Sequence, residues 1–244
     1  TGISSMWIDR YSDPCSLVEI ERRSAIFGQP YLVDKNETLG GGVDRLRRAL
    51  QAIYIPTQKT SETILRELER AQEHARTVYA NEETILANIY GRQDLCHDEN
   101  KTPTLITGLS GSGKSSMRKT IKRILGDGQR LPIGDKHILQ TYPYLDVTVG
   151  PRDTLAGLLT PLARPEIREG SLRVKQRDFP LDCSNWLRQS GVCLFGVDEM
   201  QFLTQSADAS AQVSKALLAY HSLGVPWHVV MNFSLAWKLL RRPH

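Results

Sequence analysis

The chain has 244 residues, of which 40% are hydrophobic and 24% charged, and its formal net charge of +4 permits nucleic-acid binding without requiring it. No apolar run approaches the ~20 residues that a membrane-spanning helix needs, and no signal-peptide pattern opens the sequence. Cys15, Cys96, Cys183 and Cys193 lack paired or zinc-type spacing, so we expect reduced thiols in a cytoplasmic protein that has no membrane partner.

Residues 1–100 are predicted to form a mainly helical N-terminal extension. Apolar residues recur at helical spacing in three stretches: Val43–Ile53, Ile64–Val78 and Ile85–Tyr90. Ser61 is the candidate N-cap of the second helix and Asn81 that of the third, which should stop at Gly91. The triple glycine at 40–42 predicts a flexible break before the first helix.

The clearest motif is residues 108–115, Gly-Leu-Ser-Gly-Ser-Gly-Lys-Ser, which fit the phosphate-binding pattern G-x-x-x-x-G-K-[S/T]. A short β-branched and apolar run, Thr104–Thr107, precedes the loop, and a helical repeat of apolar residues follows it as far as Leu125. In such a loop the glycines let backbone N–H groups surround phosphates, and the helix N-terminus adds partial positive charge.

The loop residues predicted to bind nucleotide are Gly108, Ser110, Gly111, Ser112, Gly113, Lys114, Ser115 and Ser116. We expect Lys114 to reach the β- and γ-phosphates and to act as a catalytic residue, and Ser115 to supply a hydroxyl to Mg²⁺.

A second strand is predicted at 144–149, followed by a helix with Asp153 as its cap. Residues 151–177 carry six Lys or Arg against three Asp or Glu, a local charge of +3. Three of these basic residues are candidate DNA contacts: Arg173, Lys175 and Arg177. A solvated basic surface explains the same residues equally simply.

An apolar run, Val192–Val197, ends in the acidic pair Asp198-Glu199, 84 residues after Lys114. Buried parallel strands are typically continuous apolar runs, and ligands bind beyond their carboxyl ends. At that position, known as Walker B, Asp198 would hold Mg²⁺ and Glu199 would act as the general base that activates water.

A third strand is predicted at Trp227–Met231, and Asn232 at its tip is a candidate sensor of the γ-phosphate and the third catalytic residue; a strand-end turn also favours asparagine. A helical repeat then leads to Arg241 and Arg242. Either arginine is a candidate finger acting on a neighbouring subunit's nucleotide, whereas a basic helix end favoured by the helix dipole is the alternative.

Guanine-binding N-K-x-D and the transporter signature L-S-G-G-Q are both missing from the sequence, which favours ATP and a different class of ATPase. An adjacent Asp-Glu pair followed by a strand ending in asparagine is typical of AAA+ proteins. We therefore predict an α/β fold, a P-loop NTPase of AAA+ type with a parallel sheet flanked by helices. This core would occupy residues 101–244, with no lid domain within the chain.

The chain resembles the TnsC/TniB-type AAA+ ATPases, which regulate transposons with multi-component transposases. The resemblance rests on Tyr54–Gln58, the loop at 108–115, and Val197–Leu203, which is similar to the family's D-E-x-Q-x-L run. It implies a bacterial protein that uses ATP and Mg²⁺ to assemble a ring or helical filament on double-stranded DNA. Such a protein links a target-selection protein to transposase subunits and disassembles on hydrolysis. Residues 1–53 match no motif.

Three other classes remain open from the sequence. One is a signalling or scaffold ATPase of the nucleotide-switch type, with protein partners and no DNA. Another is a small-molecule or polynucleotide kinase, which would need a substrate-binding lid. The last comprises helicase loaders and other AAA+ remodellers, which share these motifs.

Overall fold

The structure is a computed structural model that describes residues 16–28, 36, 38–91, 102–133, 137–150, 154–170, 175, 178–205 and 209–233. These residues fall into two compact units, one ending at Arg66 and the other starting at Glu67. The division lies inside helix α4 (Gln58–Val78). The sequence placed the boundary near residue 100, but the end of α4 and helix α5 (Glu82–Tyr90) belong to the unit that contains the sheet.

The unit ending at Arg66 contains α2 (Leu17–Ser24) and α3 (Leu39–Ala52), followed by the first part of α4. Residues 40–42 lie within α3, so the prediction of a break there was wrong. The Thr38 hydroxyl accepts a hydrogen bond from the Gly41 backbone N–H at 3.3 Å and starts the helix upstream of the glycines. The glycines occupy the first turn, where this cap offsets part of their entropic cost.

Two further helix starts test the predicted caps. Helix α4 begins at Gln58, before Ser61, because the Thr57 hydroxyl accepts from the Thr60 N–H at 3.3 Å; the Ser61 cap was therefore wrong. The Asn81 cap is confirmed, since its side chain accepts from the Thr84 N–H at 2.8 Å in a capping box. Helix α5 ends before Gly91, as its sequence predicted.

The second unit is built on a parallel four-stranded sheet in the order β1-β6-β5-β4. Its strands are β1 (Thr104–Gly108), β4 (Tyr144–Thr148), β5 (Leu194–Asp198) and β6 (Trp227–Asn232). All four lie where the sequence predicted strands. Strand β6 lies between β1 and β5, so the strand before the glycine loop and the strand before the acidic pair are separated by the strand that ends in Asn232.

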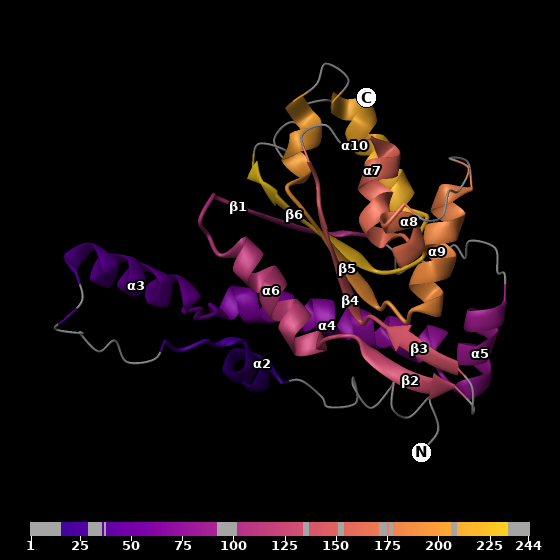
Figure 1. The fold of residues 1–244 in the computed structure, drawn as a ribbon, viewed down its shortest axis with the longest axis horizontal. Coiled ribbons are helices and arrows are strands. Elements are labelled where there is room, and N and C mark those ends of the chain that lie inside the picture. Colours follow the sequence, from indigo (N-terminus) through magenta and orange to yellow (C-terminus); the bar gives the residue numbers. More distant parts are fainter. Residues whose placement is uncertain are drawn as a thin grey trace. The chain divides into compact units, whose positions relative to one another are not determined.

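Helices cover both faces of this sheet, as Figure 1 shows. Helix α6 (Lys114–Leu125) and the end of α4 lie on one face. The other face carries α7 (Leu155–Leu159), α8 (Pro165–Arg168), α9 (Phe179–Gln189) and α10 (Ala209–His221), with short 3-10 turns at Thr160–Leu162 and Met200–Gln205. The main apolar core fills this second interface and includes Phe195, Tyr220 and Trp227 with stacked and tilted rings.

Two features of this unit were not predicted. Thr154, and not Asp153, caps α7, since its hydroxyl accepts from the Gly157 N–H at 3.1 Å; Asp153 lies outside the described residues. An antiparallel hairpin of β2 (Gln129–Ile133) and β3 (His137–Thr141) follows α6 as a separate two-stranded sheet.

None of the described helices has the length and apolar character to cross a bilayer.

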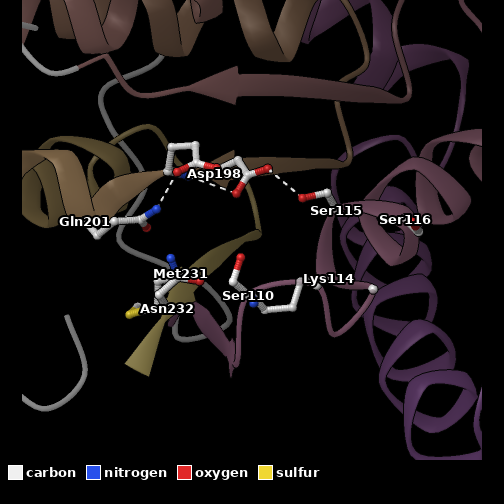
Figure 2. A pocket seen from close by; sticks show the side chains of 11 residues that line it. Ser110, Lys114, Ser115, Ser116, Asp198, Gln201, Met231 and Asn232 are labelled. Atoms are coloured by element: carbon white, nitrogen blue, oxygen red, sulfur yellow. Dashed lines mark hydrogen bonds between the residues drawn. The ribbon is translucent and has the colours of Figure 1, made fainter. Parts of the chain in front are cut away.

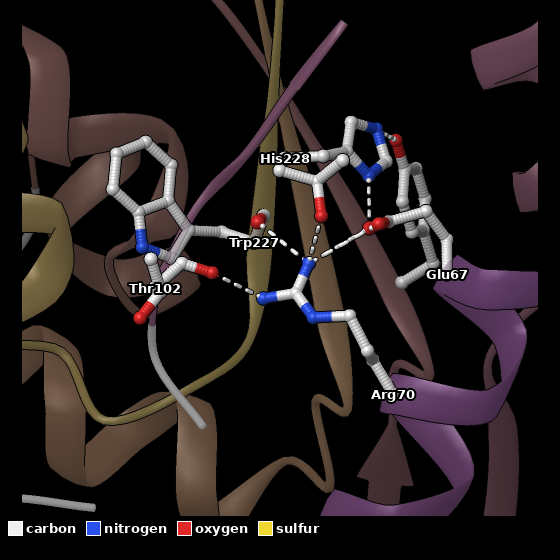
Figure 3. A network of polar contacts seen from close by, with 7 residues as sticks. Glu67, Arg70, Thr102, Trp227 and His228 are labelled. Atoms are coloured by element: carbon white, nitrogen blue, oxygen red, sulfur yellow. Dashed lines mark hydrogen bonds and ion pairs between the residues drawn. The ribbon is translucent and has the colours of Figure 1, made fainter. Parts of the chain in front are cut away.

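A buried polar network crosses the sheet on its α4 face (Figure 3). The Tyr144 hydroxyl lies 3.2 Å from His228 Nε2, and His228 Nδ1 lies 3.2 Å from the Glu67 carboxylate. Burial by itself would raise the pKa of the Glu67 carboxyl, but the hydrogen bond and charge of His228, together with Arg70, outweigh it and hold the pKa below its ordinary value. The network thereby stabilises a charged carboxylate that is fully buried.

Arg70 ties the same carboxylate to the backbone of the sheet. Its Nη1 lies 3.1 Å from Glu67 and donates to the Thr104 hydroxyl at 2.7 Å and to the Trp227 carbonyl at 3.2 Å. Its Nη2 donates to the Thr102 carbonyl at 2.6 Å. These contacts hold α4 against β1 and β6 at the point where the second half of α4 begins.

Gly196→Ala should destabilise the fold by about 2–4 kcal/mol, because a Cβ at this position overpacks the sheet face and disrupts a buried hydrogen bond. The added atom would lie 2.1 Å from the Tyr144 hydroxyl and 2.6 Å from His228 Nε2. Denaturant unfolding measures the loss.

Gly40→Ala is the matched control, since nothing lies within 4 Å of its added Cβ, and helix propensity should make that variant neutral or more stable. Adding Tyr144→Phe to Gly196→Ala should restore part of the stability, because it removes the closest atom. Equal stability of Gly196→Ala and the wild type would contradict the close packing.

Candidate functional site

A cavity of about 260 Å³ lies at the carboxyl ends of β1, β5 and β6. Figure 2 shows the side chains of the glycine loop and the start of α6 on one side of it, and those at or just after the ends of β5 and β6 on the other. The lining residues are Ser110, Gly111, Gly113, Lys114, Ser115, Ser116, Asp198, Glu199, Gln201, Met231 and Asn232. This is the edge of a parallel sheet where ligands typically bind.

The backbone of the loop requires glycine at two positions. Gly111 and Gly113 adopt φ angles of 78° and 83°, in the left-handed region that favours glycine. Gly113 is the N-cap of α6, and glycine has no side chain with which to cap the helix. The first residues of α6 line the cavity, so this helix N-terminus is placed to bind an anion.

The Lys114 side chain folds back over the loop in this structure. Its ammonium donates to the carbonyl oxygens of Gly108 at 2.9 Å and Leu109 at 2.6 Å and lies 3.5 Å from the Ser112 hydroxyl. These contacts hold the ammonium at the cavity wall. A phosphate entering the loop would compete with two neutral carbonyls for it, and a charged acceptor forms the stronger hydrogen bond.

The predicted metal pair, Ser115 and Asp198, comes together at the base of the cavity. The Ser115 hydroxyl lies 3.4 Å from Asp198 Oδ2, and Asp198 Oδ1 accepts from the Glu199 backbone N–H at 2.9 Å. Asp198 is the last residue of β5 and is 7% exposed. One carboxylate and one hydroxyl fit Mg²⁺, which typically takes its other ligands from phosphate oxygens and water.

Glu199 has a φ angle of 61°, a left-handed conformation that costs a glutamate energy and is common at functional sites. The turn carries its side chain to the cavity wall. There its Oε2 accepts a hydrogen bond from Gln201 Nε2. The carboxylate that was predicted as general base is therefore held by a neighbouring amide in this structure.

Asn232 ends β6 and pairs in register with Gly108, the first residue of the loop. The interposed position of β6 brings Asn232 between the loop and the acidic pair, on the cavity wall. An amide there can donate to a phosphate oxygen or a water molecule.

Of the predicted nucleotide-binding residues, six line the cavity. Gly108 and Ser112 do not line it, but both contact the Lys114 ammonium. The predicted finger residues Arg241 and Arg242 lie outside the described part of the chain, as do Arg173 and Arg177. Lys175 is described and exposed. Cys183 and Cys193 are buried thiols; burial raises the pKa of Cys183 to about 12.

Three polar residues near the cavity were not assigned a role from the sequence: Arg118, Asp146 and Gln201. Arg118 lies on α6 three residues after Ser115, and its Nη2 is 3.2 Å from Asp198 Oδ2. Asp146 is a charged residue in a strand otherwise rich in apolar side chains, and it faces the same guanidinium. The i, i+3 spacing of Ser115 and Arg118 was a usable signal for a shared helix face.

No protein-family model matches the chain, and no curated protein sequence matches it significantly.

Proposed function

We propose that this protein is a Mg²⁺-dependent ATPase of the P-loop class. The observation that carries the proposal is the convergence of Lys114, Ser115, Asp198, Glu199 and Asn232 on one cavity at the carboxyl edge of a parallel sheet. The loop and the N-terminus of α6 would bind the phosphates, with Lys114 between the β- and γ-groups. Ser115 and Asp198 would hold Mg²⁺, which supplies positive charge to the phosphate oxygens.

The hydrolytic step would use Glu199 and Asn232. Glu199 would accept the proton of a water molecule as its oxygen attacks the γ-phosphorus, and ADP would leave with the electrons of the broken P–O bond. Asn232 would orient that water or the γ-phosphate. Release of Glu199 from Gln201 would accompany this step, because the carboxylate oxygen that accepts from Gln201 would then accept from the attacking water.

At a finer level we propose an AAA+ regulator of DNA transposition. It would be a bacterial, cytoplasmic protein that assembles with ATP on double-stranded target DNA as a ring or filament, connects a target-selection protein with the transposase, and disassembles on hydrolysis. Support comes from the Asp-Glu pair followed by a strand ending in Asn232, and from the D-E-x-Q-x-L run at 198–203. The position of β6 beside β5 adds to this support, because a γ-phosphate sensor is expected at the tip of the strand next to Walker B.

A nucleotide-switch ATPase with protein partners is the second candidate, favoured by one observation. Helix α3 has no buried residue among its fourteen, and it exposes apolar side chains at helical spacing: Leu39, Val43, Leu46 and Leu50. Such a stripe suits a protein surface better than a phosphate backbone.

Electron microscopy of the full chain, with a slowly hydrolysed ATP analogue or ADP and with or without duplex DNA, separates these candidates. We expect rings or filaments with the analogue and DNA together, and their loss as salt concentration rises, because phosphate contacts release counterions. The Lys114→Ala variant serves as the control that should not assemble. Assembly with the analogue alone, without DNA, would favour the nucleotide switch. Assembly that is the same with the analogue and with ADP would contradict both candidate functions.

A further inference from the structure

Arg118 is a largely buried cation next to the candidate metal site. Its side chain is 11% exposed, and it extends from α6 toward the middle of β4 and the end of β5. A guanidinium keeps its charge in such a position, so its counter-ions determine what it does.

Two carboxylates share this guanidinium. Asp198 Oδ2 lies 3.2 Å from Arg118 Nη2, and Asp146 Oδ1 lies 3.5 Å from Arg118 Nε. Lys122, one turn further along α6, lies 3.5 Å from Asp146 Oδ2 and is half exposed. The cluster therefore holds two acids and two cations, of which Arg118 is the one paired with Asp198.

The pair between Arg118 and Asp198 is not the parallel two-bond arrangement that makes such pairs strong. Among the described residues, Arg118 Nε and Nη1 have no hydrogen-bond partner, and a single nitrogen approaches Asp198. That nitrogen approaches Oδ2, the same oxygen that lies near the Ser115 hydroxyl. The carboxylate oxygen best placed to bind a cation beside Ser115 is thus already shared with a fixed positive charge.

We propose that Arg118 is a positioning residue that orients Asp198 toward Ser115 and sets the Mg²⁺ concentration at which nucleotide binds. This inference rests on the proposed function, since it concerns the metal that would accompany ATP. Arg118 keeps the Asp198 carboxylate oriented toward Ser115 and balances its negative charge. A Mg²⁺ ion held by Ser115 and Asp198 would lie near this fixed positive charge, and the repulsion between the two cations would weaken Mg²⁺ binding.

The test measures binding of a fluorescent ATP analogue to the full chain as Mg²⁺ is titrated, so its readout does not depend on turnover. Arg118→Met should lower the Mg²⁺ concentration for half-maximal binding by about 10-fold, because one positive charge leaves the metal's surroundings. Lys122→Met is the matched control: it removes the same charge from the same helix but does not contact Asp198, and its midpoint should stay within about 2-fold of the wild type.

Arg118→Lys retains the charge and should keep a Mg²⁺ midpoint within about 3-fold of the wild type. Comparison with Arg118→Met then separates the effect of the charge from that of the side chain's shape. Arg118→Met leaves Asp198 without this counter-ion and leaves Asp146 with Lys122 alone, so it can fail to fold. The double variant Arg118→Met/Asp146→Asn removes one of those acids; it should fold and still show a lower midpoint than Asp146→Asn alone.

An unchanged or higher Mg²⁺ midpoint in folded Arg118→Met, or an equal shift in Lys122→Met, would overturn the role of Arg118. Failure of the proposed function has a different signature. In that case the wild-type chain would not bind the ATP analogue at any Mg²⁺ concentration.

Discussion

Lys114→Ala should reduce ATP affinity by at least about 100-fold, because it removes the charged donor that would lie between the β- and γ-phosphates. In the structure the Lys114 ammonium contacts loop carbonyls and one serine hydroxyl, so the side chain holds the loop and not the core. The variant should therefore fold with nearly wild-type stability. Isothermal titration with ATP and Mg²⁺ measures the affinity, and thermal unfolding verifies the fold.

Lys119→Ala is the control for this experiment. Lys119 lies on the same helix, is exposed, and does not line the cavity. Its replacement by alanine changes the net charge of the helix by the same amount as Lys114→Ala. We expect its ATP affinity to stay within about 2-fold of the wild type. Retained affinity in Lys114→Ala would reject the phosphate-binding role of the loop.

Glu199→Gln should leave ATP binding intact and slow hydrolysis by about 100-fold or more, because glutamine cannot accept the proton of the attacking water. The substitution preserves the size of the side chain and can still accept the hydrogen bond from Gln201. The unusual backbone at Glu199, with its φ of 61°, should therefore be retained. Phosphate release under saturating ATP measures the rate, and nucleotide titration measures binding.

Glu169→Gln removes an exposed carboxylate away from the cavity and should hydrolyse ATP at the wild-type rate. Normal turnover in Glu199→Gln would show that another group accepts the proton. Lost binding in the same variant would mean that Glu199 supports the fold of the cavity and is not a base. Comparison with Lys114→Ala separates binding from chemistry, since the two variants should fail at different steps.

Patterns in the sequence predicted the elements that surround the cavity because their signals are local. A β-branched run before the glycine loop, a helical repeat after it and apolar runs ending in Asp198 and Asn232 each depend on neighbouring residues. The Asn81 cap succeeded for the same reason, since its partner Thr84 is three residues away. The Ser61 cap and the break at 40–42 failed where an earlier threonine, Thr57 or Thr38, started the helix first.

The hairpin β2–β3 was not predicted because β2 contains Pro132, which weakens a strand signal. Gly196 could not be recognised as a packing requirement either. A glycine in a buried apolar strand gives no indication that a tyrosine from the neighbouring strand crosses over it to reach a histidine.

The chemistry that the cavity offers could be predicted from short stretches of sequence: a phosphate loop, a carboxylate pair and a strand-end amide each consist of a few adjacent residues. The contacts that no motif links appear only in the folded chain. Glu67 and His228 are 161 residues apart in the sequence, yet their side chains are within hydrogen-bond range, and Arg118 reaches Asp198 from helix α6. Such contacts depend on the strand order β1-β6-β5-β4, which places the carboxyl ends together. Strand order results from the packing of all helices and strands at once, and no local stretch of sequence encodes it.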